Sequence, residues 1–446
     1  MGKKQGEQGA AWLSEKMSGQ VDFEQRSLGS SDEIGLQYLR SLTNSDTINR
    51  YIVIPSYEME SLQAFENFIA SFPGTVQAAE RSQTIEYVLK GFVLISIGNR
   101  GYLFDAVKVE SSGIGEAVNE AIVQGPRDAF SESIELNMNL IRRRYQSESL
   151  KIDMLTVGKV SRTSVAILYD DERVDRQVLD EMKKRIKNVK IDILQSAGEL
   201  EKYISPERVR IFPTMIVTER PDRVVFNIAE GKVAVLINSN GFAILAPSIF
   251  SDFFTAMDDK IQVPLVGWFL KIIRYIGLFL TLTLPSLYVT FASYNPEILK
   301  VQISLLIAGS RAAVPHPSFM EVFLMLLMME FLTEASLRLP KAIGPTATTV
   351  GGLILGQAAT QAGLVSNIMI ILVSAVAISN FIIPLSMMGY TIRVIKYIMI
   401  LFAITFGLLG VVGSVVGLIM YLSGIRSFGR PYMKMFALEI KSKGGQ

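Results

Sequence analysis

The stretch that decides the fold is Lys341 to Arg393, KAIGPTATTVGGLILGQAATQAGLVSNIMIILVSAVAISNFIIPLSMMGYTIR, which carries no charge between its two ends. Its uncharged interior is about 51 residues long. One helix needs about 20 apolar residues to cross a hydrocarbon core of about 30 Å. The stretch is therefore long enough to cross a bilayer twice.

Two further uncharged runs, 275–296 and 397–425, are each long enough for one tilted span. We expect about four spans with additional surface or re-entrant helices, or six spans if residues 298–338 cross twice. The N-terminus has no apolar core of the kind that a secretory signal needs. Basic residues flank the apolar region on both sides, so the positive-inside tendency places both ends in the cytoplasm. These residues are Lys260, Lys271 and Arg274 before it and Arg426, Arg430, Lys434 and Lys441 after it.

The composition excludes most familiar active sites. The 446 residues include no cysteine, and His316 is the single histidine, so thiolate sites and two-histidine metal sites are ruled out. A catalytic triad would have to use His316. The glycine spacings do not follow a nucleotide-binding pattern. The net charge of +2 is spread along the chain and gives no reason to expect a nucleic-acid partner. We therefore expect no enzyme, no catalytic residue, no cofactor and no metal.

Residues 32–145 and 151–247 each alternate β-branched runs with helical patterns, which is typical of α/β units. Expected strands are 51–55, 92–97, 164–169, 190–194, 214–217 and 233–237, and expected helices are 58–70 and 173–187. The two units are predicted to be related by duplication, because five residues recur at a spacing of about 140. They are Gly91, Val93, Ile97, Gly101 and Ala106, which recur as Gly231, Val233, Ile237, Gly241 and Ala246.

The predicted fold class is thus an α/β soluble N-terminal region of two subdomains followed by an α-helical polytopic membrane domain. The predicted parts are a disordered tail (1–31), a first cytoplasmic α/β subdomain with a basic connecting helix (32–149), a second cytoplasmic α/β subdomain (150–255), a helical transmembrane domain (256–430) and a cytoplasmic tail (431–446).

The connecting helix ends in Arg142, Arg143 and Arg144, and cations at a helix C-terminus suit its dipole. Two interpretations remain open for this basic end. It is either a solvated connection or a docking surface for the membrane or another subunit.

Residues 318–338 form an apolar, methionine-rich helical segment that carries Glu321, Glu330 and Glu334. Carboxylates are costly in lipid, so these side chains must face water, headgroups or protein. Glu334 and Arg338 are spaced for an i, i+4 ion pair. The segment is predicted either to lie along the interface as an amphipathic helix or to line a cation path with its acids.

The segment 344–363, GPTATTVGGLILGQAATQAG, is predicted to be a membrane helix with one small, weakly polar face. Gly352 and Gly356 at i, i+4 allow another helix to approach closely. Alternatively, several copies around an axis would form a narrow pore solvated by hydroxyls and by Gln357. The candidate pore-lining residues are Thr346, Thr349, Gly352, Gly356, Gln357 and Thr360.

Six ordered blocks, spread over roughly residues 40–435, resemble the A subunit of bacterial spore germination receptors, the GerA family. The blocks are GPRDAFSES (125–133) with LIRRR (140–144), TERPD (218–222), RY (274–275) with LPSLYV (284–289), VPHPSFME (314–321), GQAA (356–359) with AGLVS (362–366), and RSFGRPY (426–432).

This resemblance implies an inner-membrane spore protein that responds to nutrients together with a transporter-like B subunit and a lipoprotein C subunit. It also implies a homo-oligomeric, pentameric, nutrient-gated ion channel that releases ions at the start of germination. His316 and the segment 258–264 depart from the family pattern, so gating or partner contacts are not carried over there.

Two other functions fit the residues. Broken apolar segments around Pro345 and Pro384 would suit a secondary transporter, because discontinuous helices often build substrate sites. A scaffold subunit for receptor assembly, with the α/β region as its binding module, is the third hypothesis.

Overall fold

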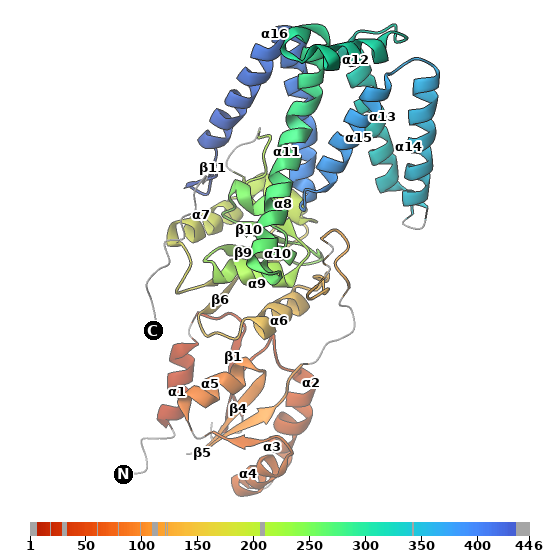
Figure 1. The fold of residues 1–446 in the computed structure, drawn as a ribbon. Coiled ribbons are helices and arrows are strands. Elements are labelled where there is room, and N and C mark those ends of the chain that lie inside the picture. Colours follow the sequence, from red (N-terminus) through yellow and green to blue (C-terminus); the bar gives the residue numbers. More distant parts are fainter. Residues whose placement is uncertain are drawn as a thin grey trace. The chain divides into compact units, whose positions relative to one another are not determined.

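The computed structural model describes residues 7–17, 19–28, 34–59, 61–78, 80–98, 100–108, 115–120, 122, 124–205, 210–340 and 343–433. The chain divides into two compact units (Figure 1). The first comprises Met1–Arg208, Met215–Ser248 and Ser427–Arg430, and the second comprises Val209–Thr214, Ile249–Arg426 and Pro431–Gln446.

The first unit contains two five-stranded antiparallel sheets with the same order of strands. One sheet has the order β1 (Phe23–Leu28), β2 (Ile34–Leu39), β4 (Phe92–Ile97), β5 (Arg100–Asp105) and β3 (Val76–Gln77), with helices α4 (Leu62–Ser71) and α5 (Arg81–Leu89). The other has the order β6 (Leu150–Val157), β7 (Thr163–Asp170), β9 (Val233–Ile237), β10 (Ala243–Ala246) and β8 (Ile216–Thr218), with helices α7 (Arg176–Lys187), α8 (Ala197–Ile204) and α9 (Pro221–Ala229). The predicted pair of α/β subdomains is confirmed, and the two share one order of strands.

The recurring glycines have different roles in the two subdomains. Gly91 and Gly231 are equivalent, because both precede a central strand with φ values of 99° and 86°, a region that favours glycine. Gly101 and Gly241 are not equivalent, since Gly101 lies inside β5 and Gly241 lies between β9 and β10. The second connection is longer, because Leu236 pairs with Ala243 whereas Ile97 pairs directly with Arg100.

Three local predictions in this unit are wrong. Residues 7–28 are not a disordered tail, because they form helix α1 (Glu7–Lys16) and strand β1, with Leu13 and Met17 fully buried. Residues 51–55 are helical, in η1 (Asn49–Val53) and α3 (Ile54–Glu58), since Ile48 and Ile52 face the core four residues apart. Residues 190–194 form no strand, and Ile191 O and Asp192 O instead accept hydrogen bonds from the loop that follows β6.

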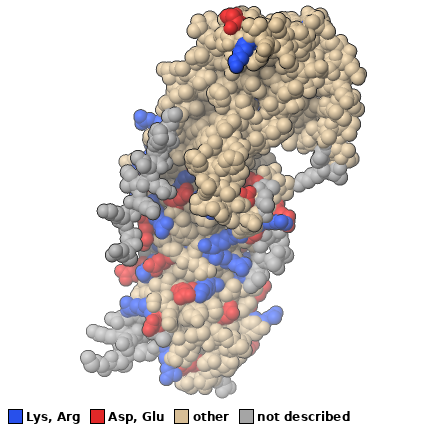
Figure 2. All heavy atoms as spheres, viewed as in Figure 1, with Lys and Arg blue, Asp and Glu red and all other residues tan. Residues whose placement is uncertain are grey.

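The second unit is helical. Its main helices are α11 (Pro264–Ser293), α12 (Val301–Arg311), α13 (Ser318–Arg338), α14 (Gly344–Gln361), α15 (Asn367–Phe381) and α16 (Ser386–Gly424). Among the described residues, α11 and α16 are long and apolar enough to cross a membrane. On the face drawn in Figure 2, this unit exposes few charged side chains, whereas the α/β unit carries both signs of charge.

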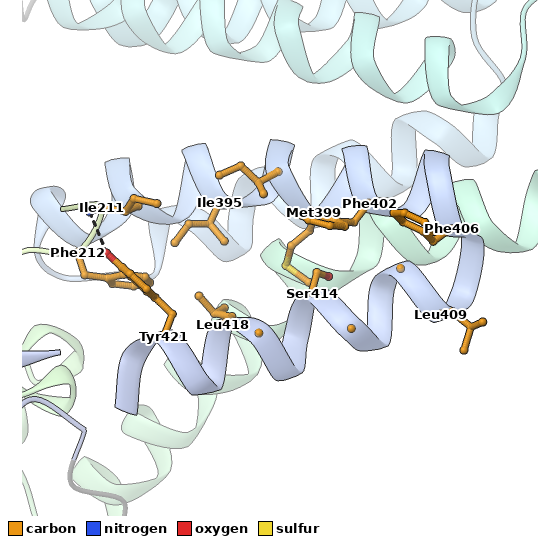
Figure 3. Close-up of a pocket in the computed structure, with 14 residues that line it drawn as sticks. Ile211, Phe212, Ile395, Met399, Phe402, Phe406, Leu409, Ser414, Leu418 and Tyr421 are labelled. Atoms are coloured by element: carbon orange, nitrogen blue, oxygen red, sulfur yellow. Dashed lines mark hydrogen bonds between the residues drawn. The ribbon is translucent and has the colours of Figure 1, made fainter. Parts of the chain in front are cut away.

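Helix α16 folds back on itself at Gly407. The backbone there has φ 57° and ψ −135°, which is not helical, and the two arms run side by side in opposite directions (Figure 3). A Cβ on Gly410 would lie 2.0 Å from Phe402 O, so the arms meet too closely for a larger residue. The prediction of one span over 397–425 is therefore wrong, and an apolar groove of about 530 Å³ lies between the arms.

Candidate functional site

Helix α14 presents the predicted small, polar face on its open side. Thr346, Thr349 and Gln357 are exposed, while Gly352, Gly356 and Thr360 are half-buried. The helix packs on α13, where a Cβ on Gly351 would lie 3.3 Å from Leu332 Cδ2. The outer face is thus left open within a single chain.

The glycines of this face are not required by contacts inside the chain. A Cβ on Gly352 would lie 3.9 Å from Leu332 Cδ1, and one on Gly356 would lie 3.9 Å from Ile370 Cδ1, which are ordinary contact distances. The Thr360 hydroxyl donates within its own helix, to Gln357 O at 2.9 Å. Its oxygen keeps lone pairs that could solvate a cation. The face carries oxygen ligands without any fixed charge.

Glu321, at the start of α13, lies inside the helical unit and is 1% exposed. Its carboxylate accepts hydrogen bonds from Arg311 Nε of α12 at 3.2 Å, from the Ser366 N–H at 2.6 Å and from Tyr288 Oη of α11 at 3.3 Å. Ser366 also caps α15, because its hydroxyl accepts from the Met369 N–H at 3.2 Å. Glu321 therefore joins α13 to three other helices and does not face water or headgroups in one chain.

Glu330, two and a half turns further along α13, binds cations from the first arm of α16. Arg393 Nε donates to Oε2 at 2.6 Å, and Lys396 Nζ donates to Oε1 at 3.1 Å. Tyr397 Oη adds a bond to Oε1 at 3.3 Å. The carboxylate thus connects α13 to α16 across the helical unit.

Glu334 differs from both, because it is exposed and contacts only its own helix in the part of the chain that is described. Arg338 Nη2 donates to Glu334 Oε1 at 2.6 Å, which confirms the predicted i, i+4 pair. His316 lies half-buried before α13, and its carbonyl accepts from Arg311 Nη2 at 3.1 Å. The described residues contain no cluster of three or more His, Asp or Glu suited to a metal ion.

The basic end of the connecting helix, α6 (Ile134–Arg144), is not uniformly solvated. Arg142 is 1% exposed and donates to Asp22 at 2.6 and 3.1 Å and to Gln20 Oε1 at 3.1 Å. Ser41 Oγ also donates to Asp22 Oδ2, at 2.6 Å. Arg142 Nη1 also donates to Leu150 O, at the start of β6 in the second subdomain, at 3.3 Å. Both earlier interpretations are therefore wrong for Arg142, which links the two α/β subdomains.

Arg143 is exposed, and Arg144 pairs with Asp128. Only these two arginines remain partly accessible at the end of α6.

The sequence did not reveal the partners of the acids, namely Arg311, Tyr288, Ser366, Arg393, Lys396 and Tyr397. One signal was available, because a carboxylate in an apolar helix requires a partner and Arg393 and Lys396 are three residues apart on one helix. Nothing in the sequence paired a given acid with a given cation.

Comparisons with known proteins agree over most of the chain. The sequence model of the Bacillus/Clostridium GerA spore germination protein family matches residues 11–443. Spore germination protein B1 of Bacillus subtilis (strain 168) is 33% identical over 406 residues, covering 89% of this chain and 84% of that protein. Spore germination protein KA of the same organism is 31% identical over 430 residues, covering 94% and 79%.

Among solved structures, the N-terminal domain of the A subunit of the Bacillus megaterium spore germinant receptor GerK3 aligns with 23% identity and a TM-score of 0.42. The alignment covers 55% of this chain and 95% of that domain.

Proposed function

The chain belongs to the Bacillus/Clostridium GerA spore germination protein family of germination receptor A subunits, and from this premise we propose that several copies form a nutrient-gated ion channel. The channel would release ions at the start of germination. No catalytic step is required. The proposal also includes a transporter-like B subunit and a lipoprotein C subunit as partners, in the spore inner membrane.

The observation that carries the proposal is the open face of α14. Thr346, Thr349 and Gln357 are exposed on a helix with no charged residue, and that helix lies against α13 on its other side. Exposed hydroxyl and amide groups are unfavourable against lipid. If several copies were arranged around an axis, these groups would line a central pore and face water and ions instead of lipid.

The orientation in the membrane follows from the cations. Lys271 and Arg274 lie in the first half of α11. Arg274 Nη2 donates at 2.9 Å to Oδ1 of Asp259, which precedes the helix. We propose that this end of α11 and both chain termini are cytoplasmic, because basic residues are retained on that side.

The experiment replaces Thr349 or Gly356 with leucine and measures ion release from spores after nutrient addition, at matched protein level. Leucine removes an oxygen ligand or narrows the lining, so we expect ion release to slow at least tenfold. The matched control is Thr405→Leu, because Thr405 is an exposed hydroxyl residue on α16. Unchanged flux in both α14 variants, or equal loss in the control, would contradict a pore at α14.

A secondary transporter remains the second candidate, favoured by the interruption between α15 and α16 at residues 382–385, which includes Pro384. Recordings from the reconstituted full-length protein separate the two functions. Unitary current steps indicate a channel, whereas saturable uptake of fixed stoichiometry indicates a carrier. If the reconstituted protein conducts normally but Arg143 and Arg144 variants lose their partner subunits, a scaffold role is indicated.

A further inference from the structure

A small cavity with five polar residues in its lining lies beside Glu330, between α13, α15 and α16. Its volume is about 30 Å³, which exceeds the roughly 10–15 Å³ that a cavity needs to hold one water molecule. The polar residues in its lining are Glu330, Thr333, Asn380, Arg393 and Lys396, and the remaining lining is apolar. A site of this size accepts one water molecule or one monatomic ion.

The charges around the cavity do not balance. Arg393 and Lys396 both pair with the single carboxylate of Glu330, and their side chains are 16% and 6% exposed. Among the described residues, no second acid lies within ion-pair distance of either cation. The next acid along α13, Glu334, is exposed and pairs with Arg338. One buried positive charge is therefore left without a counter-ion.

Lys396 keeps hydrogen-bonding capacity toward the cavity. An ammonium group has three N–H donors. One donates to Glu330 Oε1 at 3.1 Å, and the group also lies 4.9 Å from the ring centre of Tyr397. At least one donor remains. Removing a charged group from water without full pairing is strongly unfavourable, and intramembrane charges are normally compensated.

Asn380 of α15 provides the second contact. Its Oδ1 atom is buried and accepts no hydrogen bond from any described residue. Rotation of the carboxamide about χ2 places Nδ2 in that position, and the amide then offers N–H donors instead of an unpaired acceptor. The same small cavity would then be lined by an ammonium group and an amide donor.

We propose that this cavity binds one small monovalent anion, chloride being the test case, through Lys396 and Asn380. The anion neutralises the unpaired charge and links α15 to α16. A water molecule would fit the volume and could bridge Lys396 to Asn380 Oδ1, but it would leave the excess positive charge in place. Occupancy by the anion should therefore depend on the chloride concentration, whereas occupancy by water should not.

The test uses the purified full-length protein in a membrane mimic. Sodium chloride replaces sodium gluconate at constant ionic strength, because gluconate is too large for the cavity and the exchange holds screening constant. A ligand that binds the folded state raises the melting temperature in a saturable way. We expect chloride and bromide to raise it and gluconate to have no effect.

Three variants locate the effect. Lys396→Met removes the ammonium group, and Asn380→Asp supplies the negative charge covalently, so both should lose the dependence of melting temperature on chloride. In the absence of chloride, the melting temperature of Asn380→Asp should equal or exceed that of the unchanged protein. Glu334→Gln, on the exposed side of α13, should keep the full chloride dependence.

Equal melting temperatures in chloride and gluconate would overturn the proposal, as would an undiminished chloride response in Asn380→Asp. Bromide-soaked crystals provide the direct measurement, because an anomalous peak beside Lys396 is expected. A peak absent from an otherwise well-ordered cavity would identify water as the occupant and reject the anion. If Lys396→Met fails to fold, the chloride dependence of the melting temperature of Asn380→Asp still tests the proposal. None of these readouts depends on ion conduction.

Discussion

Arg142 and Glu66 are two charged residues of the α/β unit that hold separate elements together. Arg142 is buried with Asp22 and also donates to Leu150 O of β6 in the second subdomain. Glu66 of α4 accepts hydrogen bonds from Tyr102 Oη at 2.5 Å and from Arg100 Nη1 at 2.8 Å. Because Arg100 and Tyr102 lie on β5, Glu66 connects α4 to the first sheet.

Replacing Arg142 with methionine should strongly destabilise the contact between the subdomains. The Asp22 side chain is 6% exposed and would stay buried without a cation, at a cost of about 3–5 kcal/mol. Hydrogen exchange of the full-length protein, followed over 19–28 and 150–157, should become much faster. Arg143→Met is the matched control, because Arg143 is exposed, and should change stability by less than about 0.5 kcal/mol. Similar exchange in both variants would contradict the buried pair.

Glu66 should make the first subdomain sensitive to acid. The hydrogen bonds from Tyr102, and next the bond and charge of Arg100, lower the pKa of Glu66 below its ordinary value. A lowered folded-state pKa contributes stability that is complete above the unfolded pKa of about 4.3 and is lost as pH falls through the folded pKa. Exchange protection of α4 and β5, corrected for intrinsic rates, should therefore fall below about pH 4.3.

Glu66→Gln should abolish that part of the acid sensitivity, because glutamine does not titrate. Glu86→Gln is a suitable control, since Glu86 pairs at the surface with Lys90. An unchanged acid response in Glu66→Gln would show that other groups cause it.

At the scale of elements, α13 determines how the helical unit is connected. Its three carboxylates have three different environments, although all lie on one apolar helix. Glu321 joins α11, α12 and the start of α15, Glu330 joins α16, and Glu334 stays at the surface. Helix α14 packs on α13, so movements of α13 would be transmitted directly to the candidate pore helix.

The fold-back of α16 should depend on Gly407. Alanine at φ 57° and ψ −135° is strained by about 1–3 kcal/mol, because a Cβ is disfavoured there. In this cysteine-free chain, Ile395→Cys and Leu418→Cys can be joined across the groove by a flexible bis-maleimide. We expect efficient cross-linking of these two positions when residue 407 is glycine. The cross-linked fraction should fall at least several-fold in Gly407→Ala.

Gly413→Ala is the control for that measurement. Gly413 lines the same groove, but a Cβ there would have no atom within 4 Å, so cross-linking should be unchanged. Efficient cross-linking in Gly407→Ala would mean that the hairpin does not require glycine.

At the scale of the whole molecule, the proposed function requires assembly. We expect the purified full-length protein in a membrane mimic to form a rotationally symmetric homo-oligomer with α14 at the axis. Thr349→Cys should therefore cross-link between copies. Leu401→Cys, an exposed position on α16, should not. A monomeric particle, or α14 surrounded only by lipid in a reconstruction of the assembly, would contradict the proposed pore.

The order of the apolar and α/β regions could be predicted because it depends on local composition. Uncharged runs of sufficient length locate α11 and α15, and alternating β-branched runs locate β4, β7 and β9. The small face of α14 was also evident from helical spacing alone. Local patterns failed at 51–55, where core contacts made a β-branched run helical. They also failed in the N-terminal segment, where few residues are apolar but Leu13, Met17 and Leu28 are buried.

The sequence by itself determined which segments are apolar, where strands β4, β7, β8 and β9 lie, and that the chain belongs to the GerA family. Only the tertiary structure decided that Arg142 is buried, that Glu330 binds cations 63 and 66 residues away, and that Gly407 reverses α16. Periodicity reports the environment of one segment, because it arises from repeated local geometry. The partner of a charge, and the path of a helix beyond a glycine, depend on which distant segments pack together.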